Sequence, residues 1–122
     1  MIIGKEFIDN TYPNKHELII GDSLKTIPEF VKNNNTKFDI IFIDGGHDYN
    51  ISYNDIINCK NLANKETIVI LDDTINNNMF MLDWNEGPTK AWNEAKKNNI
   101  VLQMGSLDFC QGRGLSWGKY IL

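Results

Sequence analysis

The chain has 122 residues, of which 42% are hydrophobic, and it carries a formal net charge of −4 at pH 7. This length and composition predict one domain over residues 1–122 with an ordinary hydrophobic core, and they exclude a largely disordered chain. The acidic balance argues against nucleic acids and anionic membranes as partners, because both attract basic surfaces. No secretory leader and no apolar stretch of about 18 residues occurs, so we expect a soluble, cytoplasmic protein with Cys59 and Cys110 as free thiols.

The hydrophobic pattern predicts alternating strands and helices. Residues 1–15 have no clear period, and they predict either a short helix or a loop laid against the body. The elements expected after them are the strand Glu17–Ile20, the helix Leu24–Val31, the strand Asp39–Asp44, a helix from Asn50 or Ser52 to about Leu62, the strand Thr67–Leu71, the helix Thr89–Lys97, and the strands Ile100–Met104 and Leu115–Leu122. The long apolar segment Thr74–Gly87 predicts a lid or binding loop. This order predicts an α/β fold: a Rossmann-like open sheet, mostly parallel, with an antiparallel strand in a C-terminal hairpin.

The strand Asp39–Asp44 is the most informative stretch of the chain. Its residues 40–43, I-I-F-I, are all apolar, which is typical of a strand buried on both faces of a sheet. The run ends at Asp44 and Gly45, with His47 shortly after, and Gly45 lets the backbone approach a ligand closely. These residues are therefore predicted at the carboxyl end of a central strand, where open α/β sheets bind ligands.

Three carboxylates are predicted to meet at this edge of the sheet. Asp44 ends one strand, Asp72 ends the next, and Asp73 follows directly. Neighbouring parallel strands lie about 4.8 Å apart, so their terminal side chains converge. Carboxylates this close repel one another unless a cation or protons lie between them, and hard oxygen ligands suit Mg²⁺, Mn²⁺ or Ca²⁺. The alternative is that Asp44 and Asp73 cap the structures that follow them.

Two further polar residues have both a structural and a chemical interpretation. His47 is a candidate general base, metal ligand or substrate contact, or it hydrogen-bonds within its own turn. Asp22 is a candidate N-cap of the Leu24–Val31 helix, or it presents its carboxylate to the amino group of an adenine, with Ser23 supplying a backbone N–H. The two uses of Asp22 are compatible.

Three motifs carry a resemblance to a known family. They are G-D-S at 21–23, F-I-D-G-G-H-D-Y at 42–49 and I-V-I-L-D-D at 68–73. Together they resemble the class I S-adenosylmethionine-dependent methyltransferases, and most closely the metal-dependent O-methyltransferases of the macrocin and cephalosporin pathways. Two later stretches, G-P-T-K-A-W at 87–92 and R-G-L-S-W-G-K-Y at 113–120, look like the last helix and strand of that group. The resemblance runs from about Leu18 to the C-terminus.

The resemblance implies a cofactor, a metal and a set of roles. It makes Asp44, Asp72 and Asp73 the ligands of Mg²⁺ or a similar divalent cation. It makes Asp22 and Ser23 contacts of the adenine of S-adenosylmethionine, with Asp44 and Gly45 beside the cofactor, and His47 a base or substrate contact. The implied reaction is methyl transfer to a hydroxyl of a small molecule, such as a sugar or a natural product, whose pKa the metal lowers.

The chain differs from the family in its first part. The family fold has two more strand–helix units upstream, which carry the glycine-rich cofactor loop, and fifteen residues are too few to supply them. We therefore expect only the C-terminal part of that fold, with the Glu17–Ile20 strand pairing directly with Asp39–Asp44. Right-handed crossovers place the remaining helices on one face of the sheet. The opposite face is expected to lack cover, which predicts a homo-oligomer through that face or a fragment of a longer protein; its expected residues are Ile41, Ile43, Val69 and Leu71.

The sequence leaves the present activity open. The three carboxylates favour a methyltransferase. The absence of the glycine-rich loop favours a non-catalytic, methyltransferase-like remnant that serves as an assembly or binding module. A metal-dependent hydrolase with a metal-bound water is a third possibility.

Overall fold

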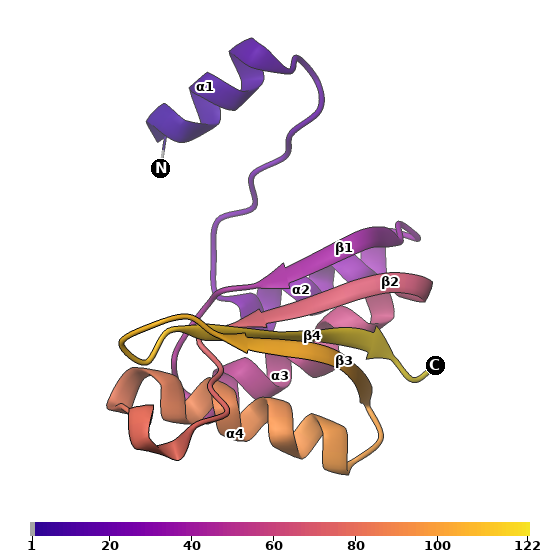
Figure 1. Ribbon diagram of the computed structural model, residues 1–122. Helices are drawn as coiled ribbons and strands as arrows, with labels where there is room; N and C mark the ends of the chain where they lie inside the picture. The colour runs from indigo at the N-terminus through magenta and orange to yellow at the C-terminus, as the bar shows by residue number, and fades with distance from the viewer. Residues whose placement is uncertain (1) are drawn as a thin grey trace.

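Four strands form one mixed sheet in the computed structural model, which describes residues 2–122 (Figure 1). The elements are α1 (Ile2–Thr11), α2 (Ser23–Asn33), β1 (Phe38–Ile43), α3 (Tyr49–Cys59), the 3-10 turn η1 (Lys60–Leu62), β2 (Ala63–Asp72), the 3-10 turn η2 (Asn78–Phe80), α4 (Asp83–Lys97), β3 (Val101–Asp108) and β4 (Gly114–Tyr120). The spatial order is β1-β2-β4-β3, and β4 is antiparallel to both of its neighbours while β1 and β2 are parallel. Three strands therefore run in one direction, and the expected α/β, Rossmann-like sheet with a C-terminal antiparallel strand is confirmed.

The hydrophobic core lies between the sheet and the helices α2, α3 and α4, which cover the same face of the sheet (Figure 1). Ile41 and Ile43 of β1 and Val69 of β2 point into it, and Ile56 of α3 and Trp92 of α4 meet them from the helical layer. The indole Nε1 of Trp92 donates to Oε1 of Gln103 at 2.8 Å, so this buried ring is also satisfied as a donor. The core therefore fixes β1 and β2 side by side.

None of the helices among residues 2–122 covers the opposite face of the sheet, but the residues on this face are not the ones that the sequence predicted. Ile41 and Ile43 are at most 8% exposed, whereas their neighbours Ile40 and Phe42 are 64% and 55% exposed. Successive side chains of a strand point to opposite faces, and both sets here are apolar, so the pattern alone could not say which set meets the helices. The prediction that this strand is buried on both faces is wrong. We call this surface the open face; it carries Ile40, Phe42, Ile68, Ile70, Leu102, Leu107, Leu115 and Trp117.

The predicted strand Glu17–Ile20 does not form. The segment has no strand partner, Ile19 and Ile20 are exposed, and β1 pairs only with β2, so the expected pairing with residues 39–44 is wrong as well. A strand needs a neighbour for its backbone hydrogen bonds, and this segment has none. Residues 1–15 were predicted as a helix or a loop on the body, and α1 is a helix that stands away from the sheet (Figure 1).

Several boundaries also differ from the prediction: β2 begins earlier, at Ala63, and β3 extends further, to Asp108, and the starts of α3 and α4 differ as well. Asp48 rather than Asn50 or Ser52 caps α3, since its Oδ1 accepts from Asn50 N at 2.8 Å and Ile51 N at 3.3 Å. The predicted lid Thr74–Gly87 is shorter, because α4 already begins at Asp83 and includes Pro88, a residue that helix interiors disfavour.

Two expectations about the whole chain can be compared with residues 2–122. Both cysteines are free, as predicted. None of the helices in this part of the chain has the length and hydrophobicity needed to cross a lipid bilayer.

Candidate functional site

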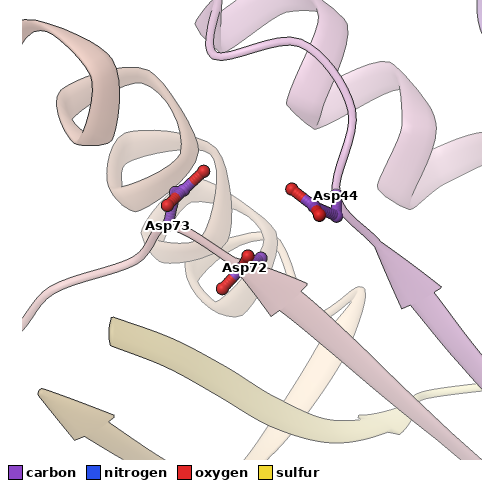
Figure 2. A group of neighbouring side chains, drawn as sticks. All are labelled: Asp44, Asp72 and Asp73. Carbon is purple, nitrogen blue, oxygen red and sulfur yellow. The ribbon is translucent and has the colours of Figure 1, made fainter. Parts of the chain in front are cut away.

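Strand register brings the predicted carboxylates together. Ile43 of β1 is paired with Leu71 of β2 in the parallel register, so Asp44 and Asp72 each follow one residue after a matched pair. Their side chains therefore leave the sheet at the same edge, and Asp73 adds a third (Figure 2). One carboxylate oxygen from each of the three residues lies within 4.8 Å of the other two.

These separations suit a divalent cation. Oxygen ligands bind Mg²⁺ at about 2.1 Å, so two oxygens on opposite sides of the ion are about 4.2 Å apart, and calcium accepts somewhat wider spacing. A cation bound by Asp44, Asp72 and Asp73 would therefore require their oxygens to lie somewhat closer together than the 4.8 Å limit seen in the metal-free site. Asp44 does not cap α3, because Asp48 has that role. The donor set is entirely carboxylate, which is the chemistry that Mg²⁺, Mn²⁺ and Ca²⁺ prefer over zinc.

Asp73 is held in an unusual conformation. Its φ is +57°, in the left-handed region that aspartate tolerates better than most residues. Its side chain is only 13% exposed. Burial raises the pKa of this carboxyl above its ordinary value, Asp72 and Asp44 raise it further, and His47 opposes them. The charged form of Asp73 is therefore disfavoured in the metal-free site, and a bound cation would favour it.

The segment after Asp73 is anchored on both sides. The hydroxyls of Thr74 and Ser116 are 2.7 Å apart in a buried hydrogen bond, and Ile75 N donates to Oγ1 of Thr89 at 3.1 Å. These contacts tie the segment to β4 and α4. The position of Asp73 is therefore determined by buried contacts and not by an exposed loop.

His47 joins the cluster from the loop after β1. Its Nε2 lies 3.0 Å from Oδ2 of Asp73, and its side chain is 51% exposed. Gly87 of α4 makes this position possible, because a Cβ there would lie 2.1 Å from the His47 carbonyl oxygen and 2.8 Å from Tyr49 N. The loop can thus lie directly against α4, with the imidazole facing both Asp73 and solvent.

The cluster forms one wall of a cavity of about 430 Å³, lined by Asp44, His47, Asp72, Asp73, Trp84 and Arg113. The centroids of the His47 and Trp84 rings are 6.3 Å apart, and the guanidinium carbon of Arg113 lies 5.7 Å from the Trp84 ring centroid. Arg113 is the only arginine of the chain, and it makes no ion pair with any residue among 2–122. The cavity therefore combines an acidic wall with an aromatic and a cationic one.

The residues predicted for the cofactor lie around a buried acid. Asp22 caps α2, with its Oδ1 accepting from Leu24 N at 3.0 Å, so the structural interpretation of this residue is confirmed. Asp55 of α3 is 3% exposed, and its Oδ1 accepts no hydrogen bond from residues 2–122. Burial raises the pKa of Asp55, a hydrogen bond with Ser23 lowers it, and Asp22 raises it. A Cβ at Gly45 would lie 3.2 Å from Oδ2 of Asp55. Asp22, Ser23 and Gly45 are thus close together although they come from different elements.

Sequence reasoning missed three residues of this region. Asp55 follows Ile51 by one helical turn, and an acid within the inward stripe of an amphipathic helix was the available signal. Trp84 was included only in the expected lid, and Arg113 only in a motif of the final strand. No local pattern points to Trp84 and Arg113 as neighbours, because the contact depends on how α4 packs beside the β3–β4 connection.

The fold is that of an α/β protein, and its candidate site lies at the carboxyl ends of two parallel strands, where open α/β sheets bind ligands. The family model Methyltransf_24, described as a methyltransferase domain, matches residues 4–74, more than half of the chain. The chain belongs to this methyltransferase family. The match includes all the predicted site residues. It begins at residue 4, upstream of Leu18, the residue from which the resemblance in the sequence runs. No curated protein and no solved structure matches the chain.

Proposed function

We propose that this protein takes part in divalent-metal-assisted methyl transfer from S-adenosylmethionine to a hydroxyl of a small molecule. The observation that carries the proposal is the convergence of Asp44, Asp72 and Asp73 within 4.8 Å at the ends of two adjacent strands. Membership of a methyltransferase family supports the reaction class. The motifs that carry these three carboxylates are the ones that resemble the metal-dependent O-methyltransferases, and this resemblance favours a metal-assisted reaction.

The metal would be held by the three carboxylates, where it would neutralise their charge and lower the pKa of an acceptor hydroxyl. Asp73 can offer one oxygen to the cation while its Oδ2 stays paired with Nε2 of His47, 3.0 Å away. A partner of this kind orients a ligand and keeps it charged. Because His47 is half exposed, it can also accept the acceptor's proton and pass it to solvent.

The candidate cofactor residues would bind only the adenine end of S-adenosylmethionine. Asp22, Ser23 and Gly45 would hold its adenine, with Asp44 at the boundary between cofactor and metal, and the cofactor would supply the methyl group from its sulfonium. The methionine end has no glycine-rich loop in this chain, since Gly4 is the only glycine before Gly21. The residues present therefore fit the adenine end of the cofactor better than its methionine end.

The part of the cavity lined by Trp84 and Arg113 suits an acceptor with a ring and an anionic group. Trp84 offers a face for stacking, and Arg113 offers a guanidinium that no side chain among residues 2–122 neutralises. An arginine of this kind binds carboxylate or phosphate in two-point geometry. A ring held on Trp84 would place its hydroxyl next to the acidic wall.

Calorimetric titration with Mn²⁺ and Mg²⁺, followed by S-adenosylmethionine, tests the proposal. Asp72→Asn should weaken metal binding at least tenfold, because it removes one of three charged ligands. Asp39→Asn is the matched control: it is the same substitution at an exposed position of β1, far from the carboxyl end, and it should leave affinity within twofold. A wild-type chain that binds neither cation would refute the proposal.

The alternative function is an assembly or binding module without catalysis. The open face of the sheet favours it, because such a surface is typical of proteins that bind a partner. Metal binding without methyl transfer from S-adenosylmethionine to dihydroxy acceptors or sugars would select this alternative.

A further inference from the structure

The open face and helix α1 are two apolar surfaces that no other element among residues 2–122 covers. On the open face, Ile40, Phe42, Leu102, Met104 at the β-bulge, and Leu107 are each at least half exposed. On α1, Ile3 is 82% and Phe7 70% exposed, and both stand on one side of the helix with Ile8. Soluble monomers seldom leave apolar surface of this extent uncovered.

The helix has the form of an element that docks on a surface. Lys5, Glu6 and Asp9 occupy its other side, where Lys5 and Asp9 form an ion pair one turn apart. Gly4 lies within the apolar side, and a Cβ placed there would meet no atom within 4 Å. A glycine at this position lets a helix backbone approach a sheet closely.

The connection directs α1 away from its own open face. Residues Lys15, Glu17 and Ile19 line a groove together with Ile27 and Phe30 of α2, so the connection runs along the helix-covered side of the domain. Although residues 12–22 could extend to about 36 Å, α1 projects away from the sheet (Figure 1). A second copy of the chain presents the same open face without this constraint.

The exposed apolar areas of the open face and of α1 also favour a dimer in which two copies exchange their helices. The exposed parts of the five sheet residues amount to roughly 600 Å², taking about 200 Å² for a large apolar side chain, and those of Ile3, Phe7 and Ile8 on α1 add roughly 400 Å². Two open faces packed on each other would bury about 1,200 Å², the lower limit for a stable interface. Reciprocal packing of helix on sheet would bury about 2,000 Å² in the dimer, well within the stable range.

We propose that two copies of this chain form a dimer in which α1 of each protomer packs across the open face of the other. This symmetric exchange covers both apolar surfaces at once. The partner is still a second copy of the chain, as the sequence predicted. The interface, however, consists of the open face and α1 and not of Ile41, Ile43, Val69 and Leu71.

The first test is the mass of the full-length chain in solution, measured by light scattering across the micromolar range. We expect a dimer. Phe7→Glu on α1 and Phe42→Lys on the open face should each weaken dimerisation at least tenfold, because each places a charge within an apolar contact. Lys5→Gln, which changes the net charge by the same amount as Phe7→Glu on the polar side of α1, should change it less than twofold.

Mixing the two weakened variants provides the decisive test. A heterodimer of Phe7→Glu with Phe42→Lys contains one unaltered helix–sheet contact, so mixing should restore a dimer that neither variant forms alone. Circular dichroism of each variant establishes that it is folded. A monomeric wild-type chain, a dimer insensitive to Phe7→Glu, or a mixture that stays monomeric would overturn the proposal. The first of these results would indicate that α1 packs on its own sheet or that another molecule covers the open face.

Discussion

Substitution of Asp73 by asparagine should make the metal-free protein more stable. Two unit charges 4.8 Å apart repel by about 0.9 kcal/mol in water and by about 3.5 kcal/mol at the effective dielectric constant of a protein site. Asp44 is exposed and Asp72 half-buried, so the lower value applies better, and two such repulsions disappear. The lost pair with His47 offsets this by up to about 1 kcal/mol. The net expectation is a gain of about 1 kcal/mol, and asparagine also tolerates the positive φ of this position.

Saturating metal should reverse the order of stability. A cation at one hundred times its dissociation constant stabilises the protein that binds it by about 2.7 kcal/mol. Wild type gains this amount and Asp73→Asn gains little, so wild type becomes the more stable protein. Thermal unfolding in EDTA and then in excess Mg²⁺ or Mn²⁺ measures both differences, and 1 kcal/mol corresponds to about 4 °C in Tm for a domain of this size.

The stability difference between wild type and Asp73→Asn in EDTA should also depend on pH, in the direction that the raised pKa of Asp73 determines. The pKa of Asp73 is raised in the folded protein, so the folded state holds this proton more tightly than the unfolded state. The destabilisation by Asp73 is therefore complete above the raised pKa and fades as the pH falls through it towards the ordinary carboxyl value. The advantage of Asp73→Asn in EDTA should disappear over that interval. Equal stability of both proteins in EDTA at neutral pH, or an equal response to metal, would refute the reasoning.

Two further substitutions test the neighbourhood of the site. Asp55→Asn should raise the free energy of unfolding at neutral pH by about 1 kcal/mol, because it removes a buried charge with an unpaired oxygen. Urea unfolding measures this difference. A loss of stability would show that the fold requires the charge of Asp55. Gly87→Ala should lower the free energy of unfolding by roughly 1–3 kcal/mol and weaken Mn²⁺ binding, since the new Cβ would overlap the His47 carbonyl oxygen.

The sequence was sufficient to predict the metal cluster because strand ends determine its geometry. The apolar runs ending at Ile43 and Leu71 identify two strands, and consecutive parallel strands are usually neighbours. Asp44, Asp72 and Asp73 then have to meet, whatever the rest of the chain does. The fold class follows from the same alternation of strands and helices.

Features that depend on partners outside the segment could not be predicted in this way. Residues 17–20 have the apolar character of a strand, but a strand exists only beside another, and no neighbour lies next to this segment. The two faces of β1 are equally apolar, so only the packing of the helical layer, with α3 against β1, decides that Ile41 is buried and Ile40 exposed. The Trp84–Arg113 contact likewise arises from tertiary packing.

The metal centre borders the open face, since Asp72 is paired with Leu115, but its geometry does not depend on helix α1. Asp44, Asp72, Asp73 and His47 are positioned by strand register and by the packing of α4, and none of these depends on α1. The cofactor residue Asp22, in contrast, directly follows the connection from α1. Phe7→Glu should consequently leave Mn²⁺ affinity unchanged. If S-adenosylmethionine binds, its affinity should fall in this variant, because the segment before Asp22 loses the anchor that a docked α1 provides.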